Sequence, residues 1–474
     1  MANVLYHGVH LTLFRVAKHI LGYGKMTEDK HQEWANNLEK TRKKYKRMLY
    51  LKPRATYKTT LYSVSNTVDQ VIEDWVQHDG TFNNRILICS ATDEMACQIL
   101  GEVKQHLKEN AELTSIFGYD IIDSDNKREV WFKNRTIHKE PNIKAKGALA
   151  ALVSEHYDII IVDDLCNNDD RESDAVREKK KRWFIDLISI LEPGGELLVI
   201  GTRWHEDDVY NMILEMNNKL SEEDKYHIEV ERIITDTGEP LFPSIYTIKD
   251  IERLKIEKGL VEFYAQYMNE PLPSETRRFD PEKFQYYTDY GLNDQQFSDA
   301  RHFAYVDPAL GKEGDYTIIF IGAVKGKELY LRDAFISNTT TPDASIGRLE
   351  YFYKGYEFLK AGIETNAFQS MYADAARKRG IPVEDVHNNK KKEIRIDSIE
   401  PFVNQGQIKF REDWNTVYPE LIEQLARYPV HKYDDGPDAL EGLIRISLKG
   451  GMLSRNVFKD FLVSGVSRFG GGKR

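Results

Sequence analysis

The sequence predicts an α/β protein made of two units, each built around its own sheet. In residues 1–270, short apolar runs alternate with segments of helical periodicity. A polar stretch with several prolines, residues 271–296, interrupts this pattern and is predicted to be a linker. A second series of strand and helix patterns occupies residues 297–449. Because apolar strands that alternate with helices are typical of sheets covered on both faces, the first unit is expected to have a mostly parallel sheet.

Three strands and one helix define the pattern of the first unit. The strands are expected at residues 85–90, 157–162 and 196–201. The helix after the first strand has apolar residues four positions apart, which places them on one face: Met95, Ile99, Val103 and Leu107. Residues 4–20 are expected to form an amphipathic helix and not a signal peptide, because histidines and basic residues interrupt the apolar ones at helical spacing.

The second unit is expected to contain a mixed sheet with flanking helices. Its strands fall at residues 302–306, 317–324, 328–332 and 361–364, and the turn Lys325-Gly326-Lys327 predicts a hairpin between two of them. Its helices are expected at residues 341–360, 369–379, 415–427 and 435–448. Residues 450–474, which are rich in Ser, Gly, Lys and Arg, are predicted to be a flexible basic tail.

The composition excludes several classes of protein. The 474 residues are 41% hydrophobic and 30% charged, as in ordinary globular proteins. No uncharged apolar run approaches the roughly 18 residues of a membrane span. The cysteines, Cys89, Cys97 and Cys166, lack the spacing of zinc ligands or of a disulfide framework. The net charge of −10 argues against an overall basic nucleic-acid binder, but not against an enzyme that gathers carboxylates in its sites and binds DNA through local basic patches.

A strand at residues 48–51 leads into a segment that resembles a phosphate-binding loop. In such loops, backbone N–H groups and the helix dipole receive the phosphates, a lysine bridges them, and a hydroxyl binds Mg²⁺. The residues expected to bind nucleotide here are Arg54, Thr56, Lys58, Thr59 and Thr60. Lys52 and Tyr57 stand where the standard pattern has glycines, so by itself the segment is also compatible with a lysine and threonines at an ordinary helix start.

Two further strands support the phosphate-binding interpretation. The strand at 157–162 is followed by Asp163, which could bind Mg²⁺, and Asp164, which could orient or deprotonate the attacking water. The strand that ends at Gly201 brings Thr202 to the carboxyl edge of the same sheet, where ligands of open α/β sheets collect. Paired aspartates after a strand also occur in ordinary turns. Together, the three elements predict a nucleoside triphosphatase.

The second unit is predicted to gather carboxylates from separate elements. Asp307 ends one strand, Glu364 ends another, and Asp435 and Asp438 share one face at the start of the C-terminal helix. Such carboxylates repel one another unless metal ions neutralise them, and two Mg²⁺ or Mn²⁺ ions suit phosphodiester hydrolysis. Each residue alone has a simpler interpretation, a polar strand end for Asp307 or a helix cap for Asp434 or Asp435. Their joint occurrence predicts a metal-dependent nuclease.

Basic residues near this cluster are expected to contact DNA phosphates. Residues 390–392 are three lysines, and Arg395 follows them before a predicted strand at 408–411. Contacts of this kind contribute affinity without reading the base sequence. The basic segments at residues 40–47 and 179–182 are expected instead to be solvated helix faces.

The order of these motifs resembles that of the large subunit of tailed-phage terminase over about residues 26–448. The motifs are residues 53–60, 85–92, 163–164, 201–205, 263–271, 306–308 and 434–440. The family implies an N-terminal P-loop ATPase that translocates double-stranded DNA and a C-terminal ribonuclease-H-like endonuclease that cuts concatemers. The implied cofactors are ATP and Mg²⁺, with Mn²⁺ as an alternative at the nuclease site. The implied partners are DNA, a portal protein and a terminase small subunit, in a ring on the portal in the host-cell cytoplasm.

The resemblance also implies roles for individual residues. In the ATPase it assigns phosphate and Mg²⁺ to Lys58 and Thr59, the strand-end acid to Asp163, the base to Asp164, and the sensing of nucleotide state to Thr202. In the nuclease it assigns the metals to Asp307, Glu364 and either Asp438 or Asp435. It further implies that residues 22–34 contact adenine, with Gln32 as the candidate residue within that range.

The sequence departs from the family in its loop and in its second acid. The loop lacks its glycines, and the residue after Asp163 is aspartate instead of glutamate. Arg54, Arg128 and Arg135 all stay open as the trans-acting arginine. The alternatives are a helicase-like or repair ATPase fused to a resolvase-type nuclease, and a non-catalytic scaffold. A helicase should carry a second motor domain with its own arginine motifs, and the sequence after residue 267 has no such pattern.

Overall fold

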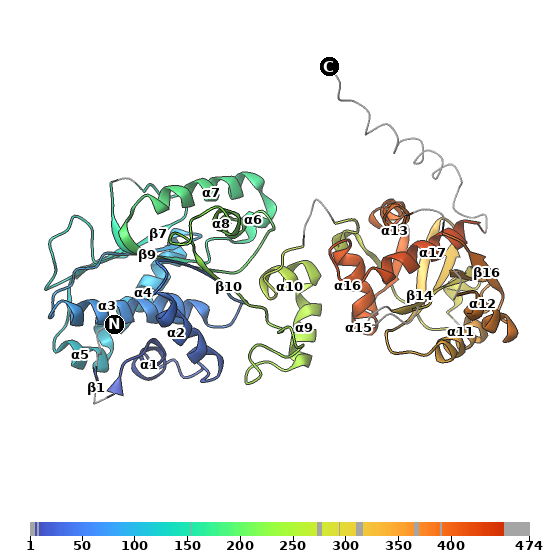
Figure 1. The fold of residues 1–474 in the computed structure, drawn as a ribbon, viewed down its shortest axis with the longest axis horizontal. Coiled ribbons are helices and arrows are strands. Elements are labelled where there is room, and N and C mark those ends of the chain that lie inside the picture. Colours follow the sequence, from blue (N-terminus) through green and yellow to red (C-terminus); the bar gives the residue numbers. More distant parts are fainter. Residues whose placement is uncertain are drawn as a thin grey trace, which may run out of the picture. The chain divides into compact units, whose positions relative to one another are not determined.

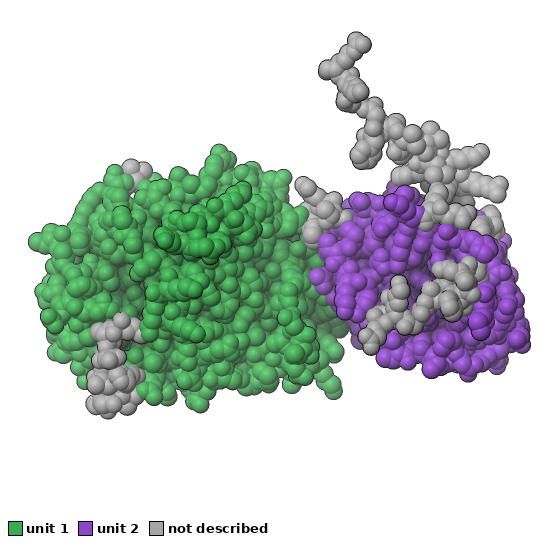
Figure 2. All heavy atoms as spheres, in the orientation of Figure 1, with its two compact units in different colours: residues 1–273 green, residues 274–474 purple. Residues whose placement is uncertain are grey.

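The computed structural model divides the chain into two compact units, residues 1–273 and 274–474 (Figures 1 and 2). It describes residues 5–6, 9–152, 154–272, 277–292, 294–309, 316–364, 369–388 and 391–449. The predicted tail at 450–474 therefore lies outside the described residues. Both units combine a sheet with flanking helices, which confirms the predicted α/β class.

The sheet of the first unit is mostly parallel, as predicted, with strand order β10-β3-β9-β8-β4-β7-β6-β5. β6 runs antiparallel to β5 and β7, whereas the other neighbouring strands pair in parallel. The strands are β3 (Arg47–Leu51), β4 (Ile86–Ser90), β5 (Ile122–Asp125), β6 (Glu129–Phe132), β7 (Ile143–Gly147), β8 (Tyr157–Asp163), β9 (Leu191–Gly201) and β10 (His227–Val230). Leu51 pairs with Gly201, and Asp163 pairs with Ile200, so the ends of β3, β8 and β9 meet at one edge.

Helices cover both faces of this sheet (Figure 1). In β8, Ile159 and Ile161 pack with one set of helices, α2, α3 and α4, whereas Ile160 and Val162 pack with α7 and α8. Burial on both faces explains why the central strands are apolar runs without alternation. The helices are α1 (Leu13–Arg15), η1 (Val16–Ile20), α2 (Lys30–Thr41), η2 (Thr59–Ser65), α3 (Asn66–Gln77), α4 (Asp93–Glu109), α5 (Ala111–Phe117), α6 (Asn168–Glu172), α7 (Asp174–Ile188), α8 (Val209–Asn217), α9 (Ile248–Lys258) and α10 (Leu260–Gln266).

The N-terminal segment differs from the helix predicted over residues 4–20. β1 (Leu5–Tyr6) and β2 (Val9–His10) form a short antiparallel pair. Helical structure begins only after Thr12, whose side chain accepts a hydrogen bond from the Arg15 amide. A threonine at this position stabilises a helix start, which explains why the helix is shorter than its apolar pattern.

The second unit has the predicted mixed sheet, with strand order β11-β17-β14-β13-β12-β15-β16. β12, β13 and β14 are antiparallel neighbours, and β15 pairs with β12 in parallel. The strands are β11 (Gln285–Tyr287), β12 (Arg301–Asp307), β13 (Thr317–Lys325), β14 (Glu328–Ser337), β15 (Ala361–Glu364), β16 (Val383–Val386) and β17 (Ile408–Arg411). The helices are η3 (Pro281–Lys283), η4 (Gln295–Phe297), α11 (Pro342–Tyr356), α12 (Gln369–Lys378), α13 (Lys392–Asp397), α14 (Glu400–Asn404), α15 (Trp414–Val417), α16 (Pro419–Arg427) and α17 (Asp435–Lys449).

α17 lies against β12 and β13, on the face opposite to α11 and α12. The close approach of α17 to β12 depends on Gly442, because a β-carbon there would lie 2.1 Å from Cζ of Tyr305. This contact holds the first turn of α17, with Asp435 and Asp438, beside the end of β12.

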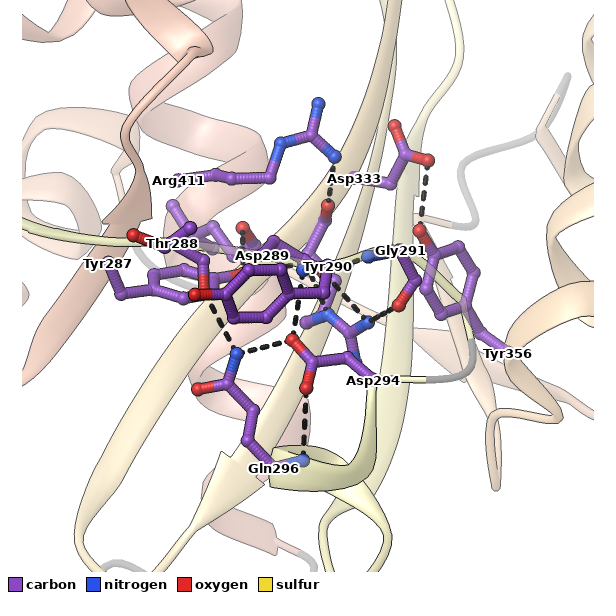
Figure 3. A network of polar contacts seen from close by, with 12 residues as sticks. Tyr287, Thr288, Asp289, Tyr290, Gly291, Asp294, Gln296, Asp333, Tyr356 and Arg411 are labelled. Atoms are coloured by element: carbon purple, nitrogen blue, oxygen red, sulfur yellow. Dashed lines mark hydrogen bonds and ion pairs between the residues drawn. The ribbon is translucent and has the colours of Figure 1, made fainter.

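The segment predicted as a linker, residues 271–296, instead contributes structure to the second unit. Its strand β11 pairs with β17 at the edge of the sheet. Beyond β11, Asp289 binds Arg332 of β14 through two hydrogen bonds, of 2.6 Å to Nε and 3.2 Å to Nη2, and the Gly291 carbonyl accepts another (Figure 3). Arg332 is fully buried, with its guanidinium 3.8 Å from the ring centre of Phe297. This buried ion pair joins residues that are far apart in the sequence, so the polar composition of the segment does not reveal it.

Removal of the Asp289 carboxylate should destabilise the second unit. Asp289→Ala leaves the Arg332 charge buried without its partner, so we expect the free energy of unfolding to fall by about 3–5 kcal/mol. Urea unfolding monitored by tryptophan fluorescence measures this change. The exposed pair between Asp397 and Arg278 provides the control, because Asp397→Ala should cost at most about 1 kcal/mol. A loss for Asp289→Ala no larger than that of the control would contradict this role.

Candidate active sites

The segment between β3 and η2 forms a tight loop without glycine. Ala55 and Tyr57 have φ angles of 62° and 56°, in the left-handed region that glycine usually occupies. The Thr56 hydroxyl donates to the Pro53 carbonyl at 2.6 Å. Ordinary residues therefore hold the turned conformation, at a cost of roughly 1–2 kcal/mol for each left-handed residue. Thr56, one of the predicted nucleotide-binding residues, uses its hydroxyl for a hydrogen bond inside the loop.

Lys52 stands where the standard phosphate-loop pattern has its first glycine, and its side chain binds outside the loop. It is fully buried, and its ammonium lies 3.1 Å from Oε2 of Glu231 and also pairs with Glu229 of β10. The same ammonium lies 4.7 Å from the ring centre of Trp34. The start of the loop is thereby anchored to the edge strand, so a long side chain at this position does not obstruct the loop.

The carboxyl ends of β3 and β8 bring four of the predicted residues together. The Lys58 ammonium lies 3.0 Å from Oδ2 of Asp164, and the Thr59 hydroxyl donates to Oδ1 of Asp163 at 3.2 Å. Ser63, one helical turn after Thr59, donates to Oδ2 of Asp163 at 2.6 Å. Ser63 is not among the residues predicted from the sequence, although its spacing from Thr59 places both hydroxyls on one helix face.

The Asp163 carboxyl is suited to hold a divalent cation. Burial and the neighbouring charge of Asp164 raise its pKa to about 6, while Lys58, Ser63 and Thr59 oppose that rise. The groups at this point are a buried carboxylate and hydroxyls, which are the hard oxygen ligands that Mg²⁺ prefers. By the chemistry of these donors, Asp163 and Thr59 fit the Mg²⁺ that accompanies a triphosphate.

The raised pKa predicts that nucleotide binding depends on pH. Protonation of Asp163 below about pH 6 removes the charge that would bind Mg²⁺, so affinity for Mg–ADP should fall as the pH falls through that value. Ser63→Ala removes a hydrogen bond to the ionised carboxylate, which should raise the pKa further and move the midpoint to higher pH. Calorimetric titration of Mg–ADP over a pH series measures both midpoints. An unchanged midpoint in Ser63→Ala would contradict the assignment.

The remaining predicted nucleotide residues surround this centre. The Thr202 hydroxyl donates to the Lys52 carbonyl at 3.2 Å, so the strand-end residue of β9 is bonded directly to the loop. Arg54 has an exposed side chain whose Nη1 donates to Oε1 of Gln266 at 2.5 Å. The guanidinium of Arg54 also lies 5.7 Å from the ring centre of Trp204. Thr60 is half-buried in the first turn of η2.

The structure places the arginine candidates in different surroundings. Arg128 is an exposed residue that pairs with Asp93 at 2.8 Å, and Arg135 donates to the Phe132 carbonyl at 2.7 Å. Arg54 is the candidate that lies within the phosphate loop. The assignment of a trans-acting arginine stays a prediction.

In the segment expected to contact adenine, the residue that touches the loop is His31. Gln32 is exposed, whereas His31 is fully buried. The Thr27 amide donates to Nδ1 of His31 at 2.9 Å, so Nε2 carries the proton and donates to the Thr56 carbonyl at 3.1 Å. Burial lowers the pKa of His31, which favours this neutral form.

The predicted acidic cluster of the second unit also comes together. Val306 pairs with Ile363, so Asp307 and Glu364 follow on adjacent strand ends. Burial raises the pKa of Asp307 well above its usual range, and the charges of Asp438, Glu364 and Asp435 raise it further. These carboxylates therefore lie close enough to repel one another, which is the condition that a bound divalent cation would relieve.

Two cations of α13 balance part of this charge. The Lys392 ammonium lies 2.6 Å from Oδ1 of Asp434 and 3.5 Å from Oδ2 of Asp438. Arg395 is buried and lies 2.6 Å from Asp438 and 2.8 Å from Glu441. The prediction that Arg395 contacts DNA is therefore wrong for this structure, because its guanidinium is buried between carboxylates. Lys390 lies outside the described residues.

In the part of the chain that the structure describes, no group of three or more His, Cys, Asp or Glu side chains is arranged to hold a metal ion. The contacts of Asp438 with Arg395 and Lys392 explain part of this absence, because both carboxylate oxygens of Asp438 already face cationic side chains. The oxygen donors still suit Mg²⁺ or Mn²⁺ by their chemistry. The choice of Asp307, Glu364, Asp435 and Asp438 as ligands stays a prediction.

Comparison with known proteins identifies the second unit. Residues 304–444, from β12 into α17, match the family model described as the terminase RNaseH-like domain. This part of the chain therefore carries a terminase RNaseH-like domain. For residues 304–444 this confirms the resemblance that the motifs predict, and the matched residues include Asp307, Glu364, Asp435 and Asp438. A search of curated proteins by sequence finds no match.

Solved terminase structures are similar to this one at low sequence identity. The large terminase of bacteriophage HK97 is 11% identical, with 92% of this chain and 99% of that chain covered and a TM-score of 0.39. The large terminase of a thermophilic bacteriophage is 10% identical, with 92% and 98% covered and a TM-score of 0.33. The large terminase nuclease of another thermophilic phage, G20c, solved with bound magnesium, is 14% identical, with 36% and 98% covered and a TM-score of 0.30.

Proposed function

We propose that this protein is a terminase large subunit, the DNA-packaging motor subunit of a tailed phage. In this role it hydrolyses ATP to move double-stranded DNA into the procapsid and cuts concatemeric DNA with a metal-dependent endonuclease. The observation that carries the proposal is the presence of a terminase RNaseH-like domain in the same chain as a phosphate-type loop. In that loop Lys58 faces Asp164 and Thr59 faces Asp163.

In the ATPase unit, a phosphate group of ATP would replace Asp164 as the ion-pair partner of Lys58. The Lys58 ammonium is paired with Oδ2 of Asp164, and an ATP phosphate is a more highly charged partner for it. Asp164 would then be free to orient the attacking water. The Asp164 amide donates to the Ile200 carbonyl at 2.9 Å, which holds the backbone of this residue between β8 and β9. Thr59 and Asp163 would hold Mg²⁺, which neutralises charge on the transferred phosphoryl group.

In the nuclease unit, strand ends and a helix start hold the carboxylates that would bind metal. Asp307, Glu364 and either Asp435 or Asp438 are the proposed ligands. When bound, two divalent cations activate a water and stabilise the leaving oxygen of the cut strand. The protein keeps these carboxylates near one another through the packing of α17 on β12.

A translocation assay tests the proposed function against the helicase-like alternative. A packaging motor should displace the third strand of a DNA triplex in an ATP-dependent reaction, while the underlying duplex stays paired. Strand separation on a forked duplex, without triplex displacement, would contradict the proposal. ATP binding without turnover would favour a scaffold.

The proposal extends to the partners that packaging requires. These are double-stranded DNA, a portal protein and a terminase small subunit, with the terminase in a ring on the portal in the host-cell cytoplasm. Among the described residues, no helix has the length and apolarity needed to cross a membrane. Co-sedimentation with portal rings in the presence of ATP-γ-S tests the portal contact directly.

A further inference from the structure

The end of α10 contacts both loops of the nucleotide site. The Gln266 carbonyl accepts a hydrogen bond from the Arg54 amide at 2.9 Å, and its side-chain Oε1 accepts another from Arg54 Nη1 at 2.5 Å. Oδ1 of Asn269 accepts from the amide of Arg203 at 3.1 Å, immediately after Thr202. Gln266 and Asn269 are 1% and 4% exposed, so these acceptors are shielded from water.

Asn269 also bonds to the edge of the sheet. Its backbone has a φ angle of 55°, and its Nδ2 donates to the Glu231 carbonyl at 2.8 Å. The Glu231 amide in turn donates to the Leu51 carbonyl at 2.9 Å, and the Glu231 side chain binds Lys52. The Asn269 carboxamide thus joins the loop that follows β9 to Glu231, which is bonded in turn to the end of β3, the strand that leads into the phosphate loop.

Residues 231–272, here called the coupling segment, have a small core of their own. Ile233, Ile251, Phe263, Tyr264, Tyr267 and Leu272 form a buried cluster of their own, whereas Leu241 and Phe242 of the same segment belong to the core of the first sheet. The Tyr246 hydroxyl adds a further polar contact, a 3.3 Å hydrogen bond to the Ala55 carbonyl. Leu241 and Phe242 thus fix one part of the coupling segment to the first sheet. The part with α9 and α10 packs in the separate cluster and is joined to the nucleotide loops by directional hydrogen bonds.

We propose that Gln266 and Asn269 are positioning residues that transmit the state of the nucleotide site to the coupling segment. The inference rests on the proposed ATPase function. A phosphate that displaces Arg54 or the Thr202 loop must either break these buried hydrogen bonds or move the coupling segment with them. Breaking them leaves buried polar groups unpaired, which is unfavourable. Movement of the part of the coupling segment with α9 and α10 is then the favoured response, and this part directly precedes the second unit in the sequence.

Matched variants separate this role from a structural one. Gln266→Met removes the side-chain acceptor for Arg54 Nη1 and leaves the backbone hydrogen bond between the two residues. Asn269→Gly keeps the left-handed backbone but removes the carboxamide. Gln266→Glu combined with Glu262→Gln should preserve activity, because it keeps an acceptor for Arg54 and the 2.8 Å bond between the two side chains. Asn142→Ala is the control, since Asn142 is 3% exposed and accepts from the Phe132 amide at 2.9 Å, away from the loops.

ATP turnover gives the first readout. We expect Gln266→Met and Asn269→Gly to lower kcat about tenfold or more, because misplaced reacting groups lose rate. KM for ATP should change less than about threefold, because Lys58 and Thr59 remain. The double variant Gln266→Glu with Glu262→Gln should recover most of the wild-type kcat. Asn142→Ala should lower the melting temperature without a fall in kcat. A normal kcat in both folded single variants, or an equal loss in the control, would overturn the inference.

Amide hydrogen exchange gives a second readout that does not depend on turnover. Addition of Mg–ATP-γ-S to the wild type should change the exchange rates of residues 259–272, and this change should be lost in Asn269→Gly and Gln266→Met. Equal responses in the variants and the wild type would overturn the inference and leave the ATPase proposal intact. A wild type that neither binds ATP-γ-S nor hydrolyses ATP would overturn both.

Discussion

Lys58→Ala should abolish ATP hydrolysis and leave metal-dependent cleavage of added DNA largely intact. The ammonium is the cation nearest to the Asp163–Asp164 pair, at 3.0 Å from Asp164. Removal of a charge that stabilises the transition state costs about 100-fold or more in rate. The carboxylate cluster belongs to the other compact unit and does not involve this lysine. Steady-state phosphate release and plasmid cleavage, measured on the same preparation, check both halves of the prediction.

Lys144→Ala is a suitable control for Lys58→Ala. Lys144 is also a largely buried lysine of the first sheet, and it pairs with Glu155 at 2.9 Å and Glu129 at 3.2 Å. It should lower stability modestly without loss of turnover. Loss of both activities in folded Lys58→Ala would show that the two sites are not separable, and normal turnover would remove the loop from the catalytic site.

Asp307→Asn should abolish DNA cleavage without lowering stability. The pKa of Asp307 is raised by burial and by Asp438, Glu364 and Asp435, so its ionised form is disfavoured in the folded protein. At neutral pH the neutral amide removes that repulsion, and the melting temperature without added metal should stay the same or rise. Loss of a metal ligand should lower the cleavage rate about 100-fold or more, because bound metals supply several kcal/mol of stabilisation.

The paired measurement distinguishes a catalytic carboxylate from a structural one. Asp397→Asn, in the exposed pair with Arg278, should retain cleavage. Cleavage retained by Asp307→Asn, or a clear fall in its melting temperature, would contradict the assignment of Asp307 to a metal-binding cluster.

Most of the fold could be predicted because burial dictates the sequence of its strands. Ile159 to Val162 are apolar on both faces of a covered sheet, and this pattern is visible without a structure. The structure of residues 271–296, predicted to be a linker, could not be read from the sequence, because it depends on contacts with residues that are distant in the chain. Strand β11 has three residues, and its neighbour Asp289 is ordered by Arg332, a partner 43 positions away that no local pattern reveals.

The convergence of the candidate site residues could be predicted where these residues directly follow the strands of a parallel sheet. Lys58, Thr59, Asp163 and Thr202 follow strands whose carboxyl ends meet, so they converge once the sheet is parallel. The conformation of the glycine-free loop could not be predicted, because Ala55 and Tyr57 adopt left-handed φ angles that their residue types do not favour. The pairing of Arg395 with Asp438 and Glu441 depends on how α13 packs against α17, which the sequence of neither helix determines.

The central claim is that one chain carries an ATPase site and a separate nuclease site. The most direct test assays wild type, Lys58→Ala and Asp307→Asn side by side for ATP turnover and for plasmid cleavage with Mg²⁺ or Mn²⁺. We predict that wild type performs both reactions, that Lys58→Ala loses only turnover, and that Asp307→Asn loses only cleavage. A folded variant that loses both, or a wild type that cuts DNA with neither metal, would contradict the claim.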